Sequence, residues 1–520
     1  MSELWKLPTT WCWTPIGDAT DVIGGGTPST TNPKNFEGSI PWITPADMSG
    51  YSNKTISGGT RFISEKGLDD SGARWLPQGT VLFSSRAPIG YVAIASRPVT
   101  TNQGFKSFVP ESGLNSDYLY YWLTSAKQHA EALASGTTFL ELSGAKAALI
   151  PLPLAPAAEQ TRIVAKLEEL LSDLDAGVAE LKAAQKKLGQ YRQSLLKAAV
   201  EGALTAEWRA AQKVGAGDTA PETGAQLLAR ILTERRARWE AKQLAKFAAQ
   251  GKPPPKDWQN KYPEPVQPDT TDLPELPEGW VWASGEQLCE FITKGTTPPK
   301  DLNPDGHKTI PFLRVTNLTD RGELDMADEV FVSAETHRGF LARSAVYPND
   351  VLMNIVGPPL GQVAVVPSTF AESNINQAIA IFRAVDGVLP SFICRYLLSP
   401  VAQQWLKARS KTTAGQTNLT LEVCRSLPFP LLPQDEQQSL IVNIEMAMNA
   451  IVSQEHSIDL SLKQSTAQRQ NILRAAFAGQ LVPQDPNDEP ASVLLERIRK
   501  ERAAQATPGK RTRRRQVEIA

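Results

Sequence analysis

The sequence predicts an α+β protein: two mixed α/β-strand domains joined by two long antiparallel coiled-coil helices, arranged as a pseudo-two-fold internal repeat. Three observations predict this class. The chain of 520 residues repeats its own landmarks at an offset near 270. Short β-branched and aromatic runs, separated by Gly, Pro, Asn and Ser clusters, fill two blocks of the chain. Two further stretches, each about 45 residues long, carry apolar residues at alternating steps of three and four.

The composition places limits on function. At 41% hydrophobic residues the chain can form several cores, and its length corresponds to three or four domains. Fifty-four lysines and arginines oppose 55 aspartates and glutamates, for a net charge of −1. This balance excludes a globally basic protein that coats nucleic acid.

Cysteine use and hydropathy predict the compartment. Cys12, Cys289, Cys394 and Cys424 are far apart and form no C-x-x-C pair, which is typical of a reduced intracellular protein without a disulfide frame or zinc site. The N-terminus has no signal-peptide pattern, and the longest apolar stretch, 147–158, contains three prolines and is too short to span a bilayer. We therefore expect a soluble, cytoplasmic chain with no membrane partner.

The repeat is visible in short landmarks that recur in the same order. The first copy and its later counterpart are Leu7-Pro8 and Leu276-Pro277, Thr27-Pro28 and Thr297-Pro298, Ile40-Pro41 and Ile310-Pro311, Val81-Leu82 and Val351-Leu352, and Asn102-Gln103 and Asn376-Gln377. From residue 151 onward the offset is constant at 277 over roughly fifty residues. Each copy is thus a globular block, a helical block and a polar extension.

The globular blocks, residues 1–153 and 275–432, are predicted to be mostly strand and turn. Runs such as 80–83, 91–95 and 361–366 have strand composition. Each block also contains one predicted helix near its end, at 117–134 and 390–409. Pro151, Pro153 and Pro156 are expected to stop the strand that precedes the first long helix.

The helical blocks, residues 154–203 and 433–480, each predict one coiled-coil spacer helix. Gly202 lies where a C-terminal cap is expected. The predicted seam consists of Val164, Leu167, Leu171, Leu174, Val178, Leu181, Leu188 and Leu195 in the first helix, and Ile441, Ile444, Met448, Ile451, Ile458, Leu462 and Ile472 in the second. Two seams in matching register favour antiparallel pairing with each other. The alternative is that each helix lies separately on its own domain.

Two polar extensions complete the copies. Residues 204–274 predict a charged helical extension and a Pro-rich linker, and residues 481–520 a short helix and a basic tail. Arg235, Arg238, Lys242 and Lys246 share one helical face near Trp239, Phe247 and Trp258. This face could meet DNA phosphate or a partner subunit, or be a solvated face balanced by Glu234 and Glu240. The tail from Lys510 to Arg515 could add non-specific attraction to DNA.

Catalytic patterns are missing from the sequence. Gly24-Gly25-Gly26-Thr27 is glycine-rich but lacks the lysine of a phosphate-binding loop, and there is no H-E-x-x-H. The four histidines are scattered, and no carboxylate pair separates from ordinary surface acids. We therefore predict no catalytic residues and no metal site, and a chain that binds rather than catalyses.

The helical blocks carry a resemblance to a known family. The first block resembles the central conserved region of a type I restriction-modification specificity subunit, and the second its distal conserved region. The matching residues are Pro156, Glu159-Gln160, Ile163-Val164, Arg192-Gln193, Leu195-Leu196, Ala198-Ala199 and Gly202, and then Pro433, Glu436-Gln437, Leu440-Ile441, Arg469-Gln470, Ile472-Leu473, Ala475-Ala476 and Gly479. The globular blocks resemble two target recognition domains, 1–153 and 275–432. Each single motif is weak, but the duplicated order is specific and covers nearly the whole chain except the two extensions.

The resemblance implies a function and partners. Each recognition domain would read one half of an asymmetric, bipartite double-stranded DNA target. The paired helices would fix the spacing and dock two methyltransferase (modification) subunits, which two ATP-driven restriction subunits join. S-adenosyl-methionine, ATP and Mg²⁺ are then expected on those partners and no cofactor on this chain, which is expected to be a non-catalytic subunit.

Residue chemistry suggests which side chains contact DNA. Arg and Lys read guanine, Asn and Gln read adenine, and Lys and Arg contact phosphates. The first block offers Lys34, Asn35, Lys54, Arg61, Lys66, Arg74, Arg86, Asn102, Gln103 and Lys106. The second offers Lys294, Lys300, Lys308, Arg314, Asn317, Arg321, Arg338, Arg343, Asn354, Asn376, Gln377, Lys411, Gln416 and Asn418. For the two recurring Asn-Gln pairs, a shared structural turn is an equal alternative.

Two other classes of function compete with DNA recognition. The chain could be a sequence-blind coiled-coil scaffold that presents two protein- or glycan-binding domains. It could also be part of an enzyme whose catalytic domain is on this chain, which the missing motifs disfavour. Binding to a duplex in the presence of a cognate methyltransferase separates the first class from DNA recognition.

Overall fold

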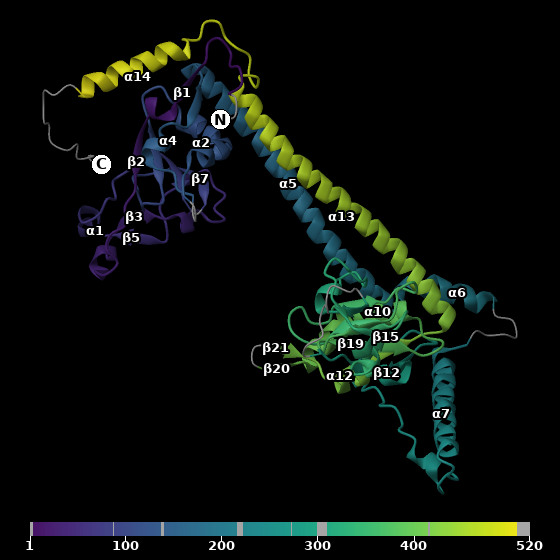
Figure 1. Cartoon of the computed structure of the whole chain (residues 1–520). Helices are drawn as coiled ribbons and strands as arrows, with labels where there is room; N and C mark the ends of the chain where they lie inside the picture. The colour runs from purple at the N-terminus through teal and green to yellow at the C-terminus, as the bar shows by residue number, and fades with distance from the viewer. Residues whose placement is uncertain are drawn as a thin grey trace. The chain divides into compact units, whose positions relative to one another are not determined.

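The chain forms a mixed α/β structure with two long helices. A computed structural model describes residues 4–86, 88–136, 140–215, 222–271, 273–298, 309–413 and 416–506 (Figure 1). Its contacts divide into two compact units. Unit 1 comprises Met1–Lys182 and Ile458–Ala520, and unit 2 comprises Ala183–Ser457. Each unit therefore contains one globular block and a half of each long helix.

The globular block of unit 1 contains two sheets and a separate strand pair. The larger sheet has the order β2-β9-β6-β7-β4 and the smaller one β5-β3-β8, while β1 pairs with β10. The strands are β1 (Cys12–Pro15), β2 (Thr20–Gly24), β3 (Ile40–Ile43), β4 (Thr55–Ile56), β5 (Arg61–Ile63), β6 (Val81–Ser85), β7 (Ile89–Ala95), β8 (Thr100–Thr101), β9 (Lys106–Pro110) and β10 (Pro151–Leu154), and the helices α1 (Glu65–Asp69), α2 (Ser116–Ser125), α3 (Lys127–Leu133) and α4 (Gly144–Ala147).

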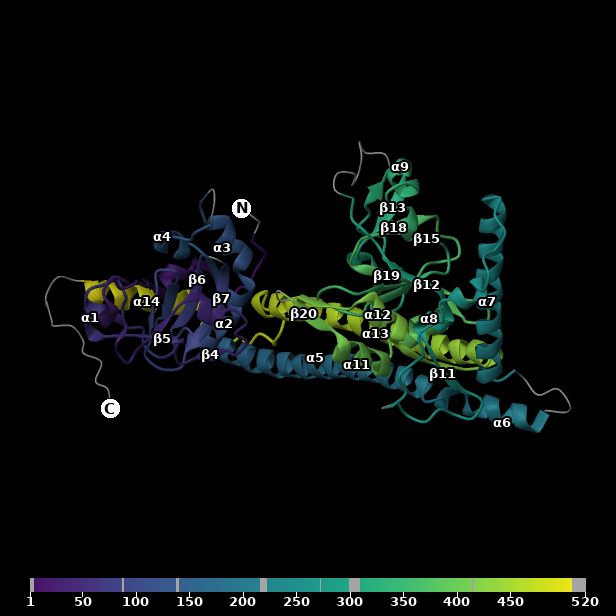
Figure 2. The same cartoon turned by 90° about the horizontal axis from the view of Figure 1, so that it is seen from below.

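The globular block of unit 2 has two four-stranded sheets, β12-β19-β16-β17 and β14-β13-β18-β15, and the strand pairs β11–β22 and β20–β21. Figure 2 labels β12 and β19 of the first sheet and β13, β15 and β18 of the second. The strands are β11 (Val281–Ser284), β12 (Cys289–Lys294), β13 (Ile310–Leu313), β14 (Phe331–Val332), β15 (Ala345–Val346), β16 (Val351–Asn354), β17 (Val363–Val365), β18 (Ser373–Ile375), β19 (Ile379–Ala384), β20 (Lys411–Thr413), β21 (Gln416–Asn418) and β22 (Pro428–Leu431). The helices are α8 (Gly285–Leu288), α9 (Ala334–Arg338), α10 (Pro390–Leu397), α11 (Pro400–Arg409) and α12 (Leu421–Ser426).

The two blocks share a strand order. Across the larger sheet of the first block the order is β2, β9, β6 and β7. The corresponding strands of the second block, β12, β19, β16 and β17, have the same order. The smaller sheets agree in the same way, because β3 and β13 each lie centrally and each pair in parallel with a later strand, β8 or β18. The predicted strands at 80–83, 91–95 and 361–366 are confirmed as β6, β7 and β17.

The prediction of one helix near the end of each block is wrong. Each block has two shorter helices there, α2 and α3 in the first and α10 and α11 in the second. Pro400 cannot donate a backbone hydrogen bond into a continuing helix, and the Ser399 hydroxyl instead accepts from the backbone N–H of Ala402 to cap α11. In the first block Ala126 leaves helical geometry, with ψ near 7°, and nothing in the sequence marks that break.

The prediction that prolines stop the strand before the long helix also needs correction. Pro151 and Pro153 lie within β10 and face Pro15 and Trp13 of β1. This is possible because β10 pairs on one side only, so that a missing N–H leaves no ladder bond unmade. The Tyr118 hydroxyl donates to the carbonyl of Pro153 at 2.5 Å, which also satisfies this strand.

The two long helices are α5 (Ala157–Val200) and α13 (Gln434–Phe477), each of 44 residues. In unit 1, Leu167 and Leu171 of α5 share a core with Ile472 of α13. In unit 2, Leu195 of α5 shares a core with Ile444 and Met448 of α13. All fifteen predicted seam residues are buried or half-buried. Gly202 follows α5 with a left-handed φ of 74°, as expected of a C-terminal cap.

The polar extensions fold back onto the globular blocks. Helix α14 (Ala491–Ala506) places Leu494 and Ile498 in the core of unit 1. Beyond the short helix α6 (Ala206–Gly215), helix α7 (Gly224–Ala249) places Leu227 and Ile231 in the core of unit 2. The basic tail from Lys510 to Arg515 lies outside the described residues. No described helix combines the length and hydropathy that crossing a bilayer requires.

Candidate nucleic-acid interface

Three of the predicted DNA-contacting residues are buried asparagines. Asn35, Asn317 and Asn354 are each at most 2% exposed. Their amides donate to backbone carbonyls, for example from Asn317 to Asp325 at 2.8 Å and from Asn354 to Pro359 at 2.5 Å. These side chains hold loops together, so DNA contact by them has no support in the fold.

The recurring Asn-Gln pairs form the same turn in both blocks. Asn102 accepts from the backbone N–H of Gly104 at 2.9 Å, and Asn376 from that of Ala378 at 3.1 Å. The adjacent Gln103 and Gln377 are exposed and accept from the hydroxyls of Thr27 and Thr297, respectively. The asparagines therefore stabilise a shared turn, which was the alternative to DNA contact. The glutamines remain at the surface.

Lys54 is committed within unit 1. Its ammonium group forms ion pairs with Asp117 at 2.8 Å and with Glu168 on α5. Burial lowers the pKa of Lys54, but the hydrogen bonds to the two carboxylates outweigh it and raise the pKa above its ordinary value. The side chain ties the globular block to the long helix and has little capacity left for phosphate.

Three arginines of the second block are also engaged by the protein. Arg314 pairs with Asp328, Arg321 with Glu455 of α13 at 3.1 Å, and Arg343 donates to the Thr296 hydroxyl at 2.9 Å. Arg321 and Arg343 are nonetheless exposed. Binding to DNA by any of the three would require exchange of a partner.

Arg86 lies in a small cluster at one end of the larger sheet of unit 1. Its guanidinium lies 4.0 Å from Glu141, and a backbone bridge joins the same two residues. Lys106 lies beside them. Burial lowers the pKa of Lys106, Glu141 raises it in part, and Arg86 lowers it. Two cations against one carboxylate favour an anion at this point.

Lys106 of unit 1 has a counterpart in unit 2, Lys294, which lies on the other strand of the equivalent strand pair. Lys106 on β9 faces Gly24 on β2, whereas Lys294 on β12 faces Ala380 on β19. Residues directly opposite in an antiparallel pair project from the same face. Each block thus carries one lysine at the same cross-strand position, although the sequence repeat does not align the two lysines.

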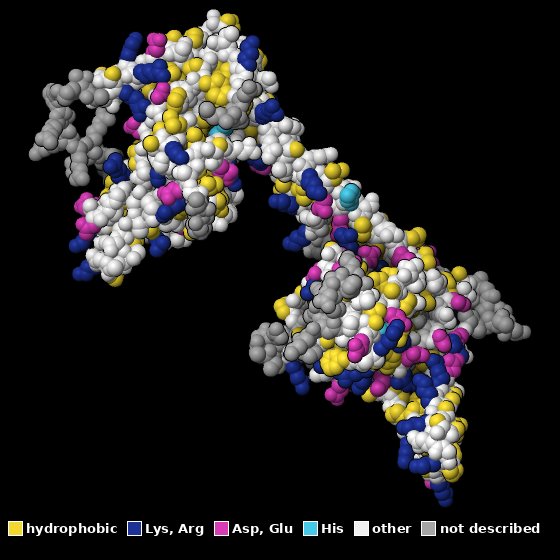
Figure 3. Space-filling model, in the orientation of Figure 1, with side chains coloured by type: hydrophobic (Ala, Val, Ile, Leu, Met, Phe, Trp, Pro, Cys, Tyr) yellow, Lys and Arg dark blue, Asp and Glu magenta, His cyan; other side chains and the backbone are white. Residues whose placement is uncertain are grey.

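The remaining candidates divide by exposure. Lys34, Arg61, Lys66, Arg74, Lys294, Arg338 and Lys411 are exposed. Figure 3 shows lysine and arginine side chains scattered over the visible face of both blocks rather than gathered on one large patch. Lys300 and Lys308 lie outside the described residues, as does the side chain of Gln416. Asn418 is half-buried on β21, and its Oδ1 accepts no hydrogen bond in the described part of the chain.

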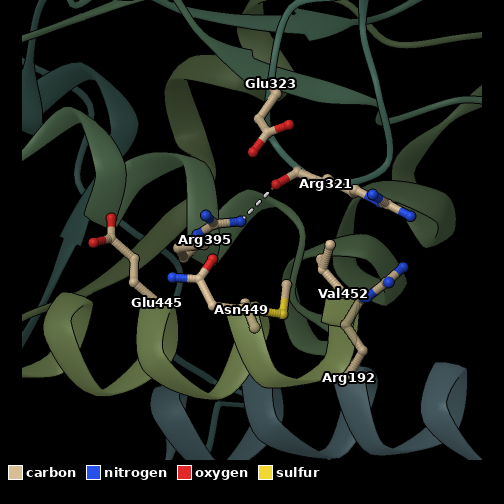
Figure 4. A pocket seen from close by; sticks show the side chains of 8 residues that line it. Arg192, Arg321, Glu323, Arg395, Glu445, Asn449 and Val452 are labelled. Atoms are coloured by element: carbon tan, nitrogen blue, oxygen red, sulfur yellow. Dashed lines mark hydrogen bonds between the residues drawn. The ribbon is translucent and has the colours of Figure 1, made fainter. Parts of the chain in front are cut away.

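Unit 2 contains an arginine-rich pocket that was not predicted from the sequence (Figure 4). A cavity of about 270 Å³ lies between α13 and the second block, lined by Arg192, Arg321, Arg395, Glu323, Glu445, Asn449, Met448 and Val452. Arg192 bridges from α5 to Glu455 at 2.6 Å, and Arg395 donates to the backbone carbonyl of Arg321 at 2.6 Å. Arg192 interrupts the seam, and that polar break was the signal available in the sequence.

Among the described residues, no three His, Cys, Asp or Glu side chains are grouped so as to hold a metal ion. The exposed candidates offer guanidinium, ammonium and amide groups, which suit phosphate and base edges.

The chain is similar to proteins of known function. Residues 8–183 match the family model described as Type I restriction modification DNA specificity domain. The MjaIX specificity subunit of Methanocaldococcus jannaschii is 41% identical over an alignment that covers 32% of this chain and 39% of that relative. The EcoBI specificity subunit of Escherichia coli is 29% identical, with 79% of this chain and 77% of the relative aligned. The EcoKI specificity subunit of Escherichia coli strain K12 is 23% identical over 96% and 97%.

A solved structure shares the fold. A chain from a study of complex assembly and conformational transition of the type I R-M system superposes with a TM-score of 0.63. It is 17% identical, and the superposition covers 92% of this chain and 100% of that one. The family match, the full-length relatives and the shared fold agree. Residues 8–183 thus match the DNA specificity domain of type I restriction-modification systems, and nearly the whole chain is similar to specificity subunits of such systems.

Proposed function

We propose that the chain is the DNA specificity subunit of a type I restriction-modification complex, in which each globular block reads one half of an asymmetric bipartite target. The observation that carries the proposal is that a specificity subunit aligns with 96% of the chain, through both blocks and both long helices. A shared strand order in the two blocks supports two readers of one kind.

The proposal includes an internal duplication. The Trp11 indole donates to Glu159 at 2.8 Å, and the Trp280 indole donates to Glu436 at 2.9 Å. The side-chain amide oxygen of Gln160 accepts from the backbone of Asn115, and that of Gln437 from the backbone of Leu389, both at 2.9 Å. Such paired bonds between helix starts and blocks are the expected result of two copies of one fold.

The proposal also includes antiparallel pairing of α5 and α13 as a spacer. The first half of α5 packs with the second half of α13 in unit 1, where Arg469 pairs with Asp175. The second half of α5 packs with the first half of α13 in unit 2, where Arg192 pairs with Glu455. Because the two helices run in opposite directions in both units, these contacts support a continuous antiparallel helix pair. Such a pair would separate the two half-sites by a constant distance.

The partners follow from this role. Two methyltransferase subunits would dock on the helices, and two restriction subunits would join them, with S-adenosyl-methionine, ATP and Mg²⁺ on those partners. The chain itself would be a non-catalytic cytoplasmic subunit. Its recognition blocks are slightly acidic, with eleven cations against twelve anions in 1–150 and thirteen against fifteen in 276–433. Partner subunits are therefore expected to supply many of the contacts to the phosphates of the DNA backbone.

The two half-sites are expected to differ. The sheet-end positions that carry Arg86 and Glu141 in the first block correspond to Val356 and Asn418 in the second, since the same isolated bridge joins each pair. Arg86 of the first block thus corresponds to Val356 of the second, and Glu141 corresponds to Asn418. The different side chains support an asymmetric target.

Co-expression with the cognate methyltransferase, followed by genome-wide mapping of methylated adenines, tests the proposal. A split asymmetric motif with a constant gap is expected. A contiguous palindrome would overturn bipartite reading. Absence of duplex binding by the assembled complex would favour the alternative, a sequence-blind scaffold for two protein- or glycan-binding domains.

A further inference from the structure

An arm with five unpaired lysines stands off the second block. The lysine arm, residues 239–262, comprises the end of α7, the 3₁₀ helix η5 (Trp258–Lys261) and the chain between them (Figure 1). Its lysines are Lys242, Lys246, Lys252, Lys256 and Lys261, and all five are exposed. None of their ammonium groups forms an ion pair or a hydrogen bond with any residue that the structure describes. Figure 3 shows Lys and Arg side chains along one side and at the end of this arm.

The arm has its own aromatic support. Trp239 of α7 stacks on Trp258 with ring centroids 5.7 Å apart and an interplanar angle of 22°. Phe247 and Tyr262 complete the cluster at 6.0 Å from Trp258 and 5.4 Å from Trp239, respectively. The lysines are therefore held on a small folded element, and its rings are engaged with one another.

The arm contributes nothing to the core of unit 2. The base of α7 is docked, because Leu227 and Ile231 are buried and Arg235 donates to the carbonyl of Cys289 at 2.6 Å. From residue 232 to residue 264, a stretch that the structure describes throughout, no residue is buried. The cationic face expected from the sequence thus divides: its arginines bind β12, and its lysines remain free.

The charge of the arm is not compensated nearby. Between residues 242 and 261 the five lysines face a single acidic residue, Asp257. Glu240 is already bound by Arg236 at 3.2 Å. Unpaired cations without a structural role indicate a polyanionic ligand.

We propose that the lysine arm binds the phosphate backbone of duplex DNA beside the target, without reading its sequence. The inference rests on the proposed DNA-specificity function. Lysine ammonium groups act as point charges without the planar fork of arginine, so they suit contacts to phosphate. Because the rings stack on one another, the arm offers no free platform for unpaired bases, and this favours duplex over single-stranded DNA.

The test uses the full-length chain assembled with its cognate methyltransferase. A variant with Lys242, Lys246, Lys252, Lys256 and Lys261 all changed to Gln is compared with wild type on a duplex that extends well beyond the target. Each phosphate contact contributes about 0.9 to the slope of log affinity against log salt. We expect the variant slope to be shallower by about 3 to 4.5, so that between 50 and 200 mM salt wild type loses about 10²-fold more affinity than the variant.

The matched control changes the same five lysines to Arg and is expected to keep the wild-type slope. A slope change below one for the Gln variant overturns the proposal. So does a Gln variant that fails to assemble with the methyltransferase, because the arm would then bind a protein. Mapping of methylated adenines separates this inference from the proposed function: both variants should keep the wild-type motif, whatever that motif is, and an altered motif would show that the arm reads sequence.

Discussion

A buried glutamate anchors the start of each long helix. Glu436 is 1% exposed and accepts from Trp280 at 2.9 Å, from the Thr205 hydroxyl at 2.7 Å and from Arg209 at 2.5 Å. Glu159, also 1% exposed, accepts from Trp11 at 2.8 Å and from Gln484. Burial raises the pKa of Glu159, and the hydrogen bonds from Trp11 and Gln484 lower it only in part. The carboxylates join a helix start to a block and to the segment that follows the other helix.

Glu436→Gln should destabilise unit 2. The change leaves Arg209 without its charge partner and places an amide donor against groups that donate, at a cost of about 1–3 kcal/mol. Urea unfolding should show a lower midpoint at an unchanged m-value. Glu445→Gln on the same helix is the control, because Glu445 is exposed and should change stability by about 0.5 kcal/mol at most. Equal midpoints for the two variants would contradict the anchoring role.

Arg86→Ala should weaken binding of the assembled complex to its target. Loss of a specific guanidinium contact costs about 1–3 kcal/mol, or roughly 5- to 150-fold in affinity. Gel-shift titration measures the effect, and circular dichroism checks the fold. Arg97→Ala is the control in the same block, because Arg97 is exposed and donates to the carbonyl of Ser57. Wild-type affinity for Arg86→Ala would remove Arg86 from the interface.

At the scale of elements, each globular block is contacted by a helix from one of the polar extensions, α14 in unit 1 and α7 in unit 2. Leu494 of α14 packs against Gly113, where an added Cβ would lie 2.5 Å from the leucine. Leu227 of α7 packs in the same way against Gly387, where an added Cβ would lie 2.8 Å from the leucine. Both glycines have φ near +90°, a conformation that other residues rarely adopt. The same contact thus holds α14 on the first block and α7 on the second.

Leu494→Ala should destabilise unit 1 by about 2–5 kcal/mol, because a fully buried leucine is lost and the site can relax only in part. Its neighbour Val493 is 45% exposed, so Val493→Ala is the control and should be nearly neutral. Thermal unfolding compares the two. If both variants melt together, α14 is not part of the folded unit.

At the scale of the whole molecule, the length of the long helices should determine the gap in the target. Deleting seven residues from the middle of each helix shortens each by about 10 Å, equivalent to about three base pairs. Seven residues are close to two helical turns, so the blocks keep their orientation to within about 20°. Mapping of methylated adenines should show a shorter gap between unchanged half-sites. An unchanged gap in a folded deletion variant would refute the spacer role.

The sequence determined much of this architecture. The apolar steps of three and four predict two long helices because the periodicity is local and extends over many turns, and Gly202 marks an end because only glycine readily takes a left-handed φ. Strand runs such as 80–83 follow from β-branched and aromatic composition. The domain boundaries, the cofactors and the DNA contacts expected from the sequence stay predictions.

The tertiary structure decided which polar residues are free. Asn35, Asn317 and Asn354 look like base readers in the sequence, but the fold buries them against backbone carbonyls. Lys54 is bound by carboxylates that lie 63 and 114 residues away, whereas the lysines of the arm have no such partner. Lys106 and Lys294 lie at equivalent cross-strand positions but on different strands of the pair, and this is likewise visible only in the strand register. Local patterns determine elements because they depend on neighbours in the chain, whereas the availability of a side chain depends on residues that only folding brings close.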